Sequence, residues 1–463
     1  MKKEDLNKAY WSCSYIESGI TMQNVGLMFC CERENPGFVA PKEDPVSTID
    51  AFLVMREQVV ELNQQTDAPC KGCPLFQKRK WKKGVTEYKI DFINFGVQSY
   101  CQFSCIYCGL QRNRGLKEGK NRPEPYDSIS IAKELKNRNM LSERLKIDYA
   151  AGEIAIHPKR KEYFEFIEEN AYIATFSSNA GIYDDQVARI LQKSKRNSLI
   201  VSIDAGTNDT FQFVRGVRAF KTVIANLKKY SEQGAQIYLK YIILNENCGQ
   251  DDVDGFIDIC NDIGIVEMSV SGDFTKTRDF KKETFYEQNI VETAVQLVQK
   301  AIQKEIPFRL INYLGDANLK KIYGELYQLP KIRQCSARLD VLLQTPNLIF
   351  YGAGKNCEVL LETWNSLDLQ KPAVIWDIAA PPSLQDSETP DQDDGCPIHH
   401  PNFEGLDNEE DAVFITITNG EVNKEIIANM HKYGFDAVMS QYDVSLALIA
   451  KQALLNEKLG EYN

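Results

Sequence analysis

Apolar and polar residues alternate with two different periods through the middle of the chain. Apolar runs of strand length occur at Tyr88–Val97, Lys146–Gly152, Tyr172–Ser177, Ser198–Asp204, Gln236–Leu244 and Val266–Ser271. Segments with a helical period follow at Ile129–Asn137, Tyr163–Asn170, Asp184–Gln192, Ala219–Gln233, Val253–Ile263 and Val291–Lys304. Strands that alternate with helices in this way are typical of parallel sheets. The pattern predicts an α/β fold, either an open doubly wound sheet or a partial (β/α)6 barrel.

The two ends of the chain differ in texture from the middle. Residues 1–84 show cysteines in place of a clear apolar period, which predicts a small domain held by a cluster more than by a core. A second α/β pattern runs through Asn347–Tyr351, a Gly-Ala-Gly turn, Asn356–Trp364, Ala373–Trp376, Ala412–Ile417 and Asn423–Tyr433, interrupted by a predicted loop at Pro381–Pro397. We therefore expect three domains: a cysteine-rich one over 1–84, a partial barrel over 85–340 and a Rossmann-like one over 341–463.

Charge and hydropathy limit the partners of this chain. Its 54 basic and 65 acidic residues give a net charge of -11, which argues against a nucleic-acid footprint and against an anionic membrane surface. No apolar segment of signal-peptide type follows the N-terminus, and no apolar run reaches the length of a membrane span. We expect a cytoplasmic protein that binds no nucleic acid and has no membrane span.

The cysteines give the first signal of chemistry. Of 13 cysteines, most precede residue 109, and in a reducing compartment metal binding or catalysis explains them better than disulfides. Cys101, Cys105 and Cys108 form one tight loop after the first predicted barrel strand. Three thiolates can bind three irons of a cubane cluster and leave the fourth iron open, and the loop lies at the face where β/α folds carry chemistry. The alternatives are a zinc site or three buried cysteines without a ligand.

This C-x3-C-x2-C spacing, with the aromatic Tyr107 before the third cysteine, resembles the radical S-adenosylmethionine superfamily over about residues 85–315. The resemblance implies a [4Fe–4S] cluster on Cys101, Cys105 and Cys108 whose open iron binds S-adenosylmethionine. Reductive cleavage of that cosubstrate would yield a 5′-deoxyadenosyl radical, with electrons from a donor such as flavodoxin or ferredoxin. The protein's own task is then to aim the radical and to exclude water.

Further segments resemble cosubstrate-binding motifs of the same superfamily. Ala151-Gly152-Glu153 resembles its Gly-Gly-Glu segment, which implies that Gly152 and Glu153 bind the methionine amino group. Ser177-Ser178-Asn179 resembles the segment that contacts the ribose, and an ordinary turn at a strand end is the alternative.

The fourth barrel strand carries another resemblance. Ser202-Ile203-Asp204-Ala205-Gly206, followed by Arg215-Gly216, resembles a segment of members that modify peptides, sugars and alditols. Ser202 and Asp204 are candidate contacts to the cosubstrate or substrate, and Arg215 could pair with a carboxylate through its forked guanidinium. Lys240 on the fifth strand would meet a carboxylate or the substrate if it points inward; an outward or snorkelling lysine is the alternative.

A second metal site is expected near the N-terminus. The candidate ligands are Cys13, Cys30, Cys31, Cys70 and Cys73. The Cys70–Cys73 pair has ligand spacing, and Cys13 with either Cys30 or Cys31 would complete a four-thiolate site. Zinc and a second [4Fe–4S] cluster both fit that count, and the resemblance favours the auxiliary cluster. The SPASM type of auxiliary domain follows the barrel, whereas this region precedes it.

Two other features suggest a substrate class. Cys248, just past the fifth strand, is a candidate hydrogen-atom donor for an epimerisation, with an ordinary loop cysteine as the alternative. Cys335 is a second candidate, and Cys260 is expected in a helix core. Gly352-Ala353-Gly354, with Asp377 after the next strand, partly matches a Rossmann fingerprint whose third glycine is Cys357. The loop histidines His399 and His400 are expected to be solvated.

These observations favour an enzyme that abstracts hydrogen from a sugar, an alditol or a nucleotide-linked glycan precursor, with epimerisation, oxidation or dehydration as the outcome. Modification of a ribosomal peptide is the rival enzyme hypothesis. The third hypothesis is a non-catalytic sensor of nucleotide or redox state. Formation of 5′-deoxyadenosine on reduction would separate the enzymes from the sensor.

Overall fold

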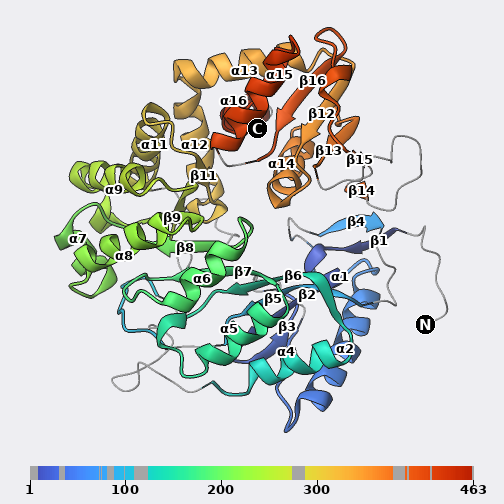
Figure 1. The fold of residues 1–463 in the computed structure, drawn as a ribbon, viewed down its shortest axis with the longest axis vertical. Helices are drawn as coiled ribbons and strands as arrows, with labels where there is room; N and C mark the ends of the chain where they lie inside the picture. Colours follow the sequence, from blue (N-terminus) through green and yellow to red (C-terminus); the bar gives the residue numbers. More distant parts are fainter. Residues whose placement is uncertain are drawn as a thin grey trace. The chain divides into compact units, whose positions relative to one another are not determined.

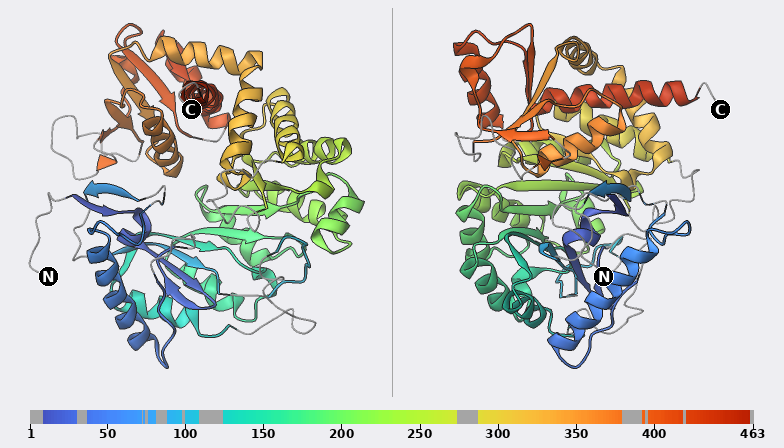
Figure 2. Two further views of the ribbon diagram at one scale, coloured as in Figure 1. Left: turned by 180° about the vertical axis from the view of Figure 1, so that it is seen from behind. Right: turned by 90° about the vertical axis from the view of Figure 1, so that its right-hand side faces the viewer.

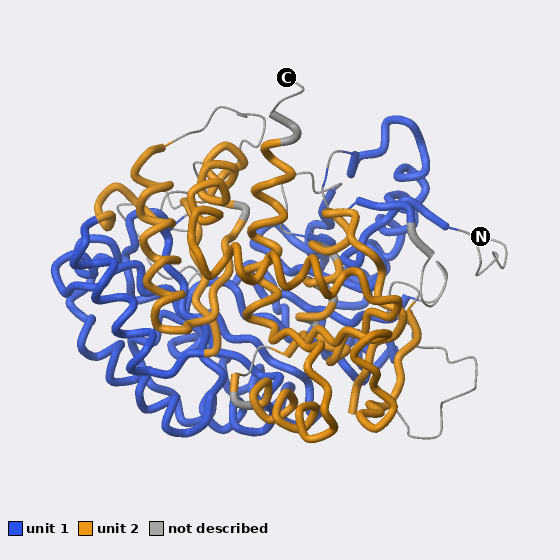
Figure 3. Tube along the Cα trace, turned by 90° about the horizontal axis from the view of Figure 1, so that it is seen from above, with its two compact units in different colours: residues 1–242, 249–265 blue, residues 243–248, 266–463 orange. Residues whose placement is uncertain are grey.

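A computed structural model describes residues 9–30, 37–71, 73, 76–80, 88–97, 100–108, 124–273, 287–378, 392–393, 396–417 and 420–460. The chain divides into two compact units (Figure 3). Unit 1 comprises residues 1–242 and 249–265, and unit 2 comprises residues 243–248 and 266–463. Cys31 and most of the stretch from 381 to 397 lie outside the described residues.

Unit 1 contains a sheet whose strands run in the order β9-β8-β7-β6-β5-β2-β3. Its strands are β2 (Gly19–Gln23), β3 (Gly26–Met28), β5 (Ile90–Phe95), β6 (Leu141–Tyr149), β7 (Ile173–Ser178), β8 (Ser198–Ser202) and β9 (Ile237–Ile243). Neighbours from β2 to β9 pair in parallel, and β3 pairs antiparallel with β2. The prediction of an α/β fold with a parallel sheet is confirmed.

Helices follow the strands of unit 1 as the periodicity predicts. They are α4 (Ser128–Asn137), α5 (Arg160–Glu169), α6 (Asp185–Lys193), α7 (Asn208–Arg215), α8 (Phe220–Glu232) and α9 (Gln250–Ile263). Figures 1 and 2 show α4 and α5 on one face of the sheet. The side chains of Ile93, Ile147 and Phe176 are buried, because alternate residues of a strand point to the same face. The sequence analysis missed the short helix α7.

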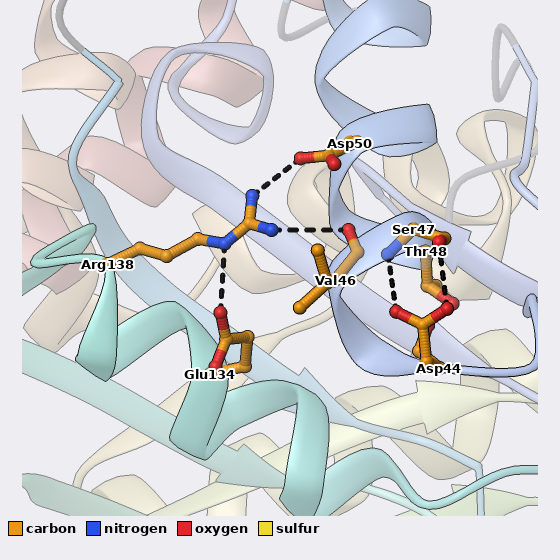
Figure 4. Close-up of polar contacts among 7 residues, drawn as sticks. All are labelled: Asp44, Val46, Ser47, Thr48, Asp50, Glu134 and Arg138. Atoms are coloured by element: carbon orange, nitrogen blue, oxygen red, sulfur yellow. Dashed lines mark hydrogen bonds and ion pairs between the residues drawn. The ribbon is translucent and has the colours of Figure 1, made fainter.

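The N-terminal stretch has more regular structure than its sequence predicts. It forms β1 (Ala9–Ser12), α1 (Ser14–Ser18), β2, β3, α2 (Pro45–Leu62) and β4 (Gln77–Lys80). Helix α2 begins at the N-cap Asp44, whose carboxylate accepts the Ser47 amide at 2.8 Å. Arg138, at the end of α4, binds Asp50 of α2 at 2.6 Å and Glu134 of its own helix at 3.1 Å (Figure 4). The predicted extent of a separate domain over 1–84 stays a prediction.

The sixth predicted strand belongs to unit 2. That strand is β10 (Glu267–Gly272), which pairs in parallel with β11 (Phe308–Leu310). The helices α11 (Gln288–Gln303), α12 (Asp316–Tyr327) and α13 (Pro330–Leu342) belong to the same unit. Cys335 is buried on α13, and its thiol donates to Asp443 at 3.4 Å.

The rest of unit 2 has a Rossmann-like strand order. Its elements are β12 (Asn347–Tyr351), α14 (Lys355–Ser366), β13 (Val374–Trp376), β14 (Gln392–Asp393), β15 (Cys396–His399), β16 (Asp411–Ile415), α15 (Gly420–Lys432), β17 (Val438–Met439) and α16 (Gln441–Gly460). The parallel strands run β15-β13-β12-β16-β17. In chain order this is 3-2-1-4-5, which reverses direction between β12 and β16.

One prediction for this region is wrong. The sequence predicts a loop over residues 381–397 that extends to the histidines. Residues 396–399 instead form strand β15, in which His399 pairs with Trp376 of β13. The proline and aspartate content of the segment concealed this strand, since its four residues carry no alternation long enough to detect. In the described part of the chain, no helix combines the length and the apolar character that crossing a membrane requires.

Candidate functional site

The three cysteines of the central motif lie in the segment after β5, which docks on the end of helix α7. The amide of Ser104 donates to the carbonyl of Arg215 at 3.1 Å, and the amide of Ile106 donates to that of Val214 at 3.0 Å. Cys105 and Cys108 are joined by a turn in which the Cys108 amide donates to the Cys105 carbonyl at 3.2 Å. The backbone of α7 thus fixes the cysteine loop by two main-chain bonds.

Gly216 allows that close approach. It ends α7 with a φ of 71°, a conformation that favours glycine. A Cβ at this position would lie 2.6 Å from the Ser104 carbonyl oxygen. The Arg215-Gly216 pair noted in the sequence is therefore a contact surface for the cysteine loop.

A buried charge pair lies at the same place. Arg215 Nη1 is 2.8 Å from Asp204 Oδ2, and both side chains are buried, at 6% and 0% exposed. The Tyr107 hydroxyl donates to Asp204 and accepts from Arg215. The other carboxylate oxygen of Asp204 accepts the Ile242 amide at 2.7 Å. Asp204 itself has a φ of 56°, which aspartate tolerates better than most residues.

Glu153, after strand β6, forms a second junction. Its carboxylate is fully buried and accepts the Asn179 amide at 2.6 Å, the Ala155 amide at 3.2 Å and the Ser178 hydroxyl at 3.0 Å. Its own amide donates to the Tyr100 carbonyl at 2.6 Å. Burial raises the pKa of the Glu153 carboxyl, and these hydrogen bonds oppose the rise. Glu153 therefore ties β6, β7 and the start of the cysteine loop together.

Asn179 extends this junction to the first cysteine. Its side-chain amide donates to the Cys101 sulfur at 3.6 Å and to the Gln102 side chain at 3.1 Å. Gln102 returns a hydrogen bond of 3.1 Å from its Nε2 to the side-chain oxygen Oδ1 of Asn179. Gln102 was missed by sequence reasoning, because only the fold brings it beside the strand that ends at Ser178.

The donor set of the loop fits an iron–sulfur cluster. Burial raises the pKa of the Cys105 thiol to about 11, whereas the positive charge of Arg215 opposes the rise. Cys101 and Cys108 lie near enough to Cys105 that their negative charges would raise its pKa further. Within the described ranges, no three His, Cys, Asp or Glu side chains converge as on a single ion. A cubane has no such requirement, because each of its three thiolates binds a different iron.

The remaining predicted contacts lie on or beside the same strand ends. Gly152 has a φ of 67° in the turn after β6. Ser177 is half-buried on β7, and Ser202 of β8 is in register with Lys240 of β9. Burial lowers the pKa of the Lys240 ammonium, and the charge of Asp204 opposes this. Their roles in cosubstrate binding stay predictions.

A polar row on the sheet was missed by the sequence analysis. Successive strands β5, β6, β7 and β8 place one polar residue each in register: Asn94, Asp148, Thr175 and Ser198. Asn94 donates to Asp148 at 3.2 Å, and the Thr175 and Ser198 hydroxyls are 3.0 Å apart. Their chain neighbours on the opposite face are buried and, except for Asn197, apolar or aromatic. Polar residues at alternate positions of these strands were the available signal.

The N-terminal cysteines are partly brought together. Cys13 and Cys70 are buried, and the negative charges of Cys70 and Cys73 add to burial in raising the pKa of Cys13 to about 11. Asn63 donates to the Cys70 sulfur at 3.4 Å. Cys30 is half-buried, and Cys31 lies outside the described residues. The choice between these two as the fourth ligand stays open.

Two further cysteines, Cys248 and Cys260, lie after β9 and on α9. Cys248 lies in unit 2, after a short 3-10 helix, and its thiol donates to the Leu244 carbonyl at 3.0 Å. Burial raises the pKa of this thiol. Cys260 is buried on α9, as predicted.

The glycine turn of unit 2 is held by the acid that the fingerprint expects at the ribose. Asp377 accepts the Ala353 amide at 2.9 Å. Thr416, after β16, donates to the Gly352 carbonyl at 2.6 Å, at the point where the strand order reverses. The turn has a φ of 111° at Gly352, and a Cβ there would lie 2.8 Å from the Thr416 hydroxyl. Cys357, in the place of the third glycine, is buried.

Comparison with known proteins yields one family and a set of partial relatives. Residues 95–252 match the model of the Radical SAM superfamily. A probable GTP 3′,8-cyclase of Saccharolobus islandicus is 23% identical over 169 residues, which cover 36% of this chain and 52% of the relative. The chain thus spans about half the length of the curated relatives it matches.

Solved structures give weaker likenesses. SuiB of Streptococcus suis, bound to its precursor peptide SuiA, has a TM-score of 0.39 at 15% identity and covers 69% of this chain and 75% of its own. A radical SAM methyltransferase from Sphaerobacter thermophilus has a TM-score of 0.33 at 14% identity, with 46% and 64% covered. Both scores are below 0.5, a level at which a likeness supports no functional conclusion.

Proposed function

Residues 95–252 place the chain in the radical SAM superfamily, and from this premise we propose an enzyme that abstracts hydrogen from a nucleotide-linked sugar. Proteins of this superfamily bind a [4Fe–4S] cluster and S-adenosylmethionine, which together supply a carbon-centred radical when bound. In this chain Cys101, Cys105 and Cys108 would hold the cluster. The residues around them orient the loop and limit its access to water.

The observation that carries this proposal is the meeting of four motif segments at adjacent strand ends. Glu153 binds the amide of Asn179, and Asn179 binds the sulfur of Cys101. Arg215 and Asp204 bind the hydroxyl of Tyr107, which lies in the same loop. Segments up to about a hundred residues apart thus converge on the cysteines, as a cosubstrate site requires.

The polar row supports a polar substrate. The interior of a filled β/α barrel is packed with branched apolar side chains, whereas here Asn94, Asp148, Thr175 and Ser198 occupy one face of the sheet. Hydroxyl, amide and carboxylate groups match the hydroxyls of a sugar. Unit 2 by itself has features of a nucleotide-binding fold, namely the 3-2-1-4-5 strand order and the glycine turn, since such folds bind ligands at the reversal point.

A second candidate is a purine nucleoside triphosphate. It is favoured by the curated relatives, which are named as probable GTP 3′,8-cyclases. The matched part covers only 36% of this chain. Binding of a purine nucleotide and the cyclase reaction are therefore two separate proposals. Peptide modification remains the third candidate, and the assay below includes it.

The test is an anaerobic assay of the reconstituted full chain with dithionite and S-adenosylmethionine. We expect 5′-deoxyadenosine without substrate at a low rate, and a rate at least about tenfold higher with the true substrate class, because substrate binding organises the site. UDP-glucose, GTP and a small-peptide mixture are the three arms, and products are identified by mass. Stimulation by GTP or peptide alone would overturn the sugar proposal, and absence of 5′-deoxyadenosine in every arm would overturn the enzyme.

For Cys248 we propose the role of hydrogen-atom donor. Its raised pKa keeps the thiol protonated, which a donor of a hydrogen atom needs. We expect Cys248→Ala to cleave S-adenosylmethionine but to lose solvent deuterium from the product. Cys260→Ala, which removes a thiol in the core of α9, is the matched control. Full yield of inverted, deuterated product from Cys248→Ala would assign this cysteine to packing.

The N-terminal cysteines are proposed as an auxiliary [4Fe–4S] site. Cys13, Cys70 and Cys73 lie within electrostatic reach of one another. A closed shell of four thiolates suits electron transfer or structural support better than substrate binding, and a structural zinc is the alternative. An electron donor of flavodoxin or ferredoxin type completes the proposed scheme.

A further inference from the structure

The cysteine loop is attached to the rest of unit 1 by main-chain bonds and by one buried charge pair. One main-chain bond joins Tyr100 to Glu153, and two more run from Ser104 and Ile106 to the last residues of α7. The charge pair joins Arg215, also on α7, to Asp204 after β8. Tyr107, which stands between two cysteines in the sequence, closes the triangle through its hydroxyl. The same helix end therefore holds both the backbone and a side chain of the loop.

The charge pair is expensive in free energy, which calls for a reason beyond packing. Removing both ions from water costs free energy, and their mutual attraction offsets this cost only with good geometry. Asp204 in addition has a left-handed backbone. It uses its second oxygen on Ile242 of β9, so that it connects two strands to the loop. An apolar contact of equal volume would stabilise the fold as well. It would supply neither the directional hydrogen bonds nor the charge of this pair.

Arg215 has a donor to spare. Its Nη1 is used on Asp204 and Tyr107, whereas its Nε has no hydrogen-bond partner among the residues that the structure describes. The side chain is buried, and its guanidinium carbon lies 5.5 Å from the ring centroid of Phe103. A buried cation with an unused N–H thus lies against the segment that carries the thiols. Cys105 and Cys101 both lie within reach of its charge.

We propose that Arg215, held by Asp204, is a positioning residue that fixes the cysteine loop and sets the charge next to the cluster. This inference rests on the proposed cluster site and goes beyond it, because it gives Arg215 a partner within the chain and not on the cosubstrate. Two consequences follow. Loss of the guanidinium should loosen the loop even in protein without iron, and the two members of the pair should shift the cluster potential in opposite directions.

The first arm measures hydrogen exchange by mass spectrometry in the iron-free full chain. We expect Arg215→Gln to speed exchange of the peptide that contains the Ser104 and Ile106 amides by about tenfold or more, because local opening becomes easier. Arg218→Gln is the matched control, since Arg218 is exposed and its Nε donates to the Gln212 side chain at 3.2 Å. Parent-like exchange in folded Arg215→Gln would overturn the proposal.

The second arm measures the midpoint potential of the cluster in reconstituted protein. Arg215→Gln should lower it, because a positive charge near the cluster favours the reduced state, and Asp204→Asn should raise it. Shifts in the same direction, or none, would overturn the electrostatic part.

If circular dichroism shows that Arg215→Gln is unfolded, Arg215→Lys replaces it. We then expect a parent-like cluster potential but faster hydrogen exchange, and parent-like exchange would again overturn the proposal. A parent chain that takes up no cluster would overturn the proposed function. The first arm would still test whether Arg215 fixes the cysteine loop, because it uses iron-free protein.

Discussion

A chain in which Cys105 is replaced by Ala should lose four irons and all cleavage of S-adenosylmethionine above background. Each thiolate of the loop binds one iron, so that a cubane with a ligand missing is exposed to solvent and unstable. With cubanes at both proposed sites, the parent should hold about eight irons per chain and the variant about four. Iron is counted after anaerobic reconstitution, and 5′-deoxyadenosine is measured by chromatography. Cys260→Ala, in the core of α9, controls for loss of a buried thiol.

The reciprocal variant is Cys70→Ala. It should lose the other irons but still bind the central cluster, because Cys70 is bound by Asn63 of the N-terminal stretch and is not one of the three cysteines of the central motif. Four irons in the parent, unchanged in Cys70→Ala, would assign the N-terminal site to zinc or to structure. Parent-like iron and cleavage in Cys105→Ala would remove the basis of the central assignment.

The strands β5 to β10 were predictable because each is largely buried and pairs in parallel with a neighbour, whereas β2 and β3 of unit 1 were missed. Such strands appear as short continuous apolar runs, and all the runs predicted between residues 88 and 271 correspond to strands. The helices between them were predictable from their apolar faces, as in α6, where Val187, Ile190 and Leu191 are buried. Helix α2 was missed, because the cysteines on both sides of it suggested an irregular region.

The contacts within the site were less predictable than its members. The motifs named Tyr107, Asp204 and Arg215 one by one, but nothing local indicates that they bind one another. Their meeting depends on α7, a helix of 8 residues whose sequence has only a short apolar face. Arg215 was expected to pair with a carboxylate, and within the described chain Asp204 supplies one. A forked cation near a cluster motif can thus serve the protein itself as well as a ligand.

The polar row shows what a sequence reading can overlook on strands already assigned. Asn94 is 7% exposed and its Oδ1 has no hydrogen-bond partner among the described residues. A buried amide oxygen without a donor costs about 1–3 kcal/mol, which a run scored only for apolar content does not reveal. Asn94 is therefore a natural place to look for a substrate contact once a substrate is known.

Glu153→Gln should destabilise the iron-free chain by about 2–4 kcal/mol and weaken binding of S-adenosylmethionine. Both oxygens of Glu153 accept backbone N–H groups, from Ala155 and from Asn179. A glutamine has one acceptor oxygen, so that its NH2 must face one of these N–H groups. Because Asn179 in turn binds Cys101, the disturbance reaches the cysteine loop.

Urea unfolding of the iron-free chain measures the loss of stability, and anaerobic equilibrium dialysis measures cosubstrate affinity. Glu162→Gln is the matched control, because Glu162 is a half-exposed glutamate of α5 whose pair with Lys133 is 3.8 Å long. Its effect should stay within about 0.5 kcal/mol, as for most surface substitutions. A parent-like midpoint for Glu153→Gln would mean that the segment after β6 tolerates an unpaired N–H. Lost stability with unchanged affinity would confine Glu153 to the scaffold and leave the cosubstrate amino group to other residues.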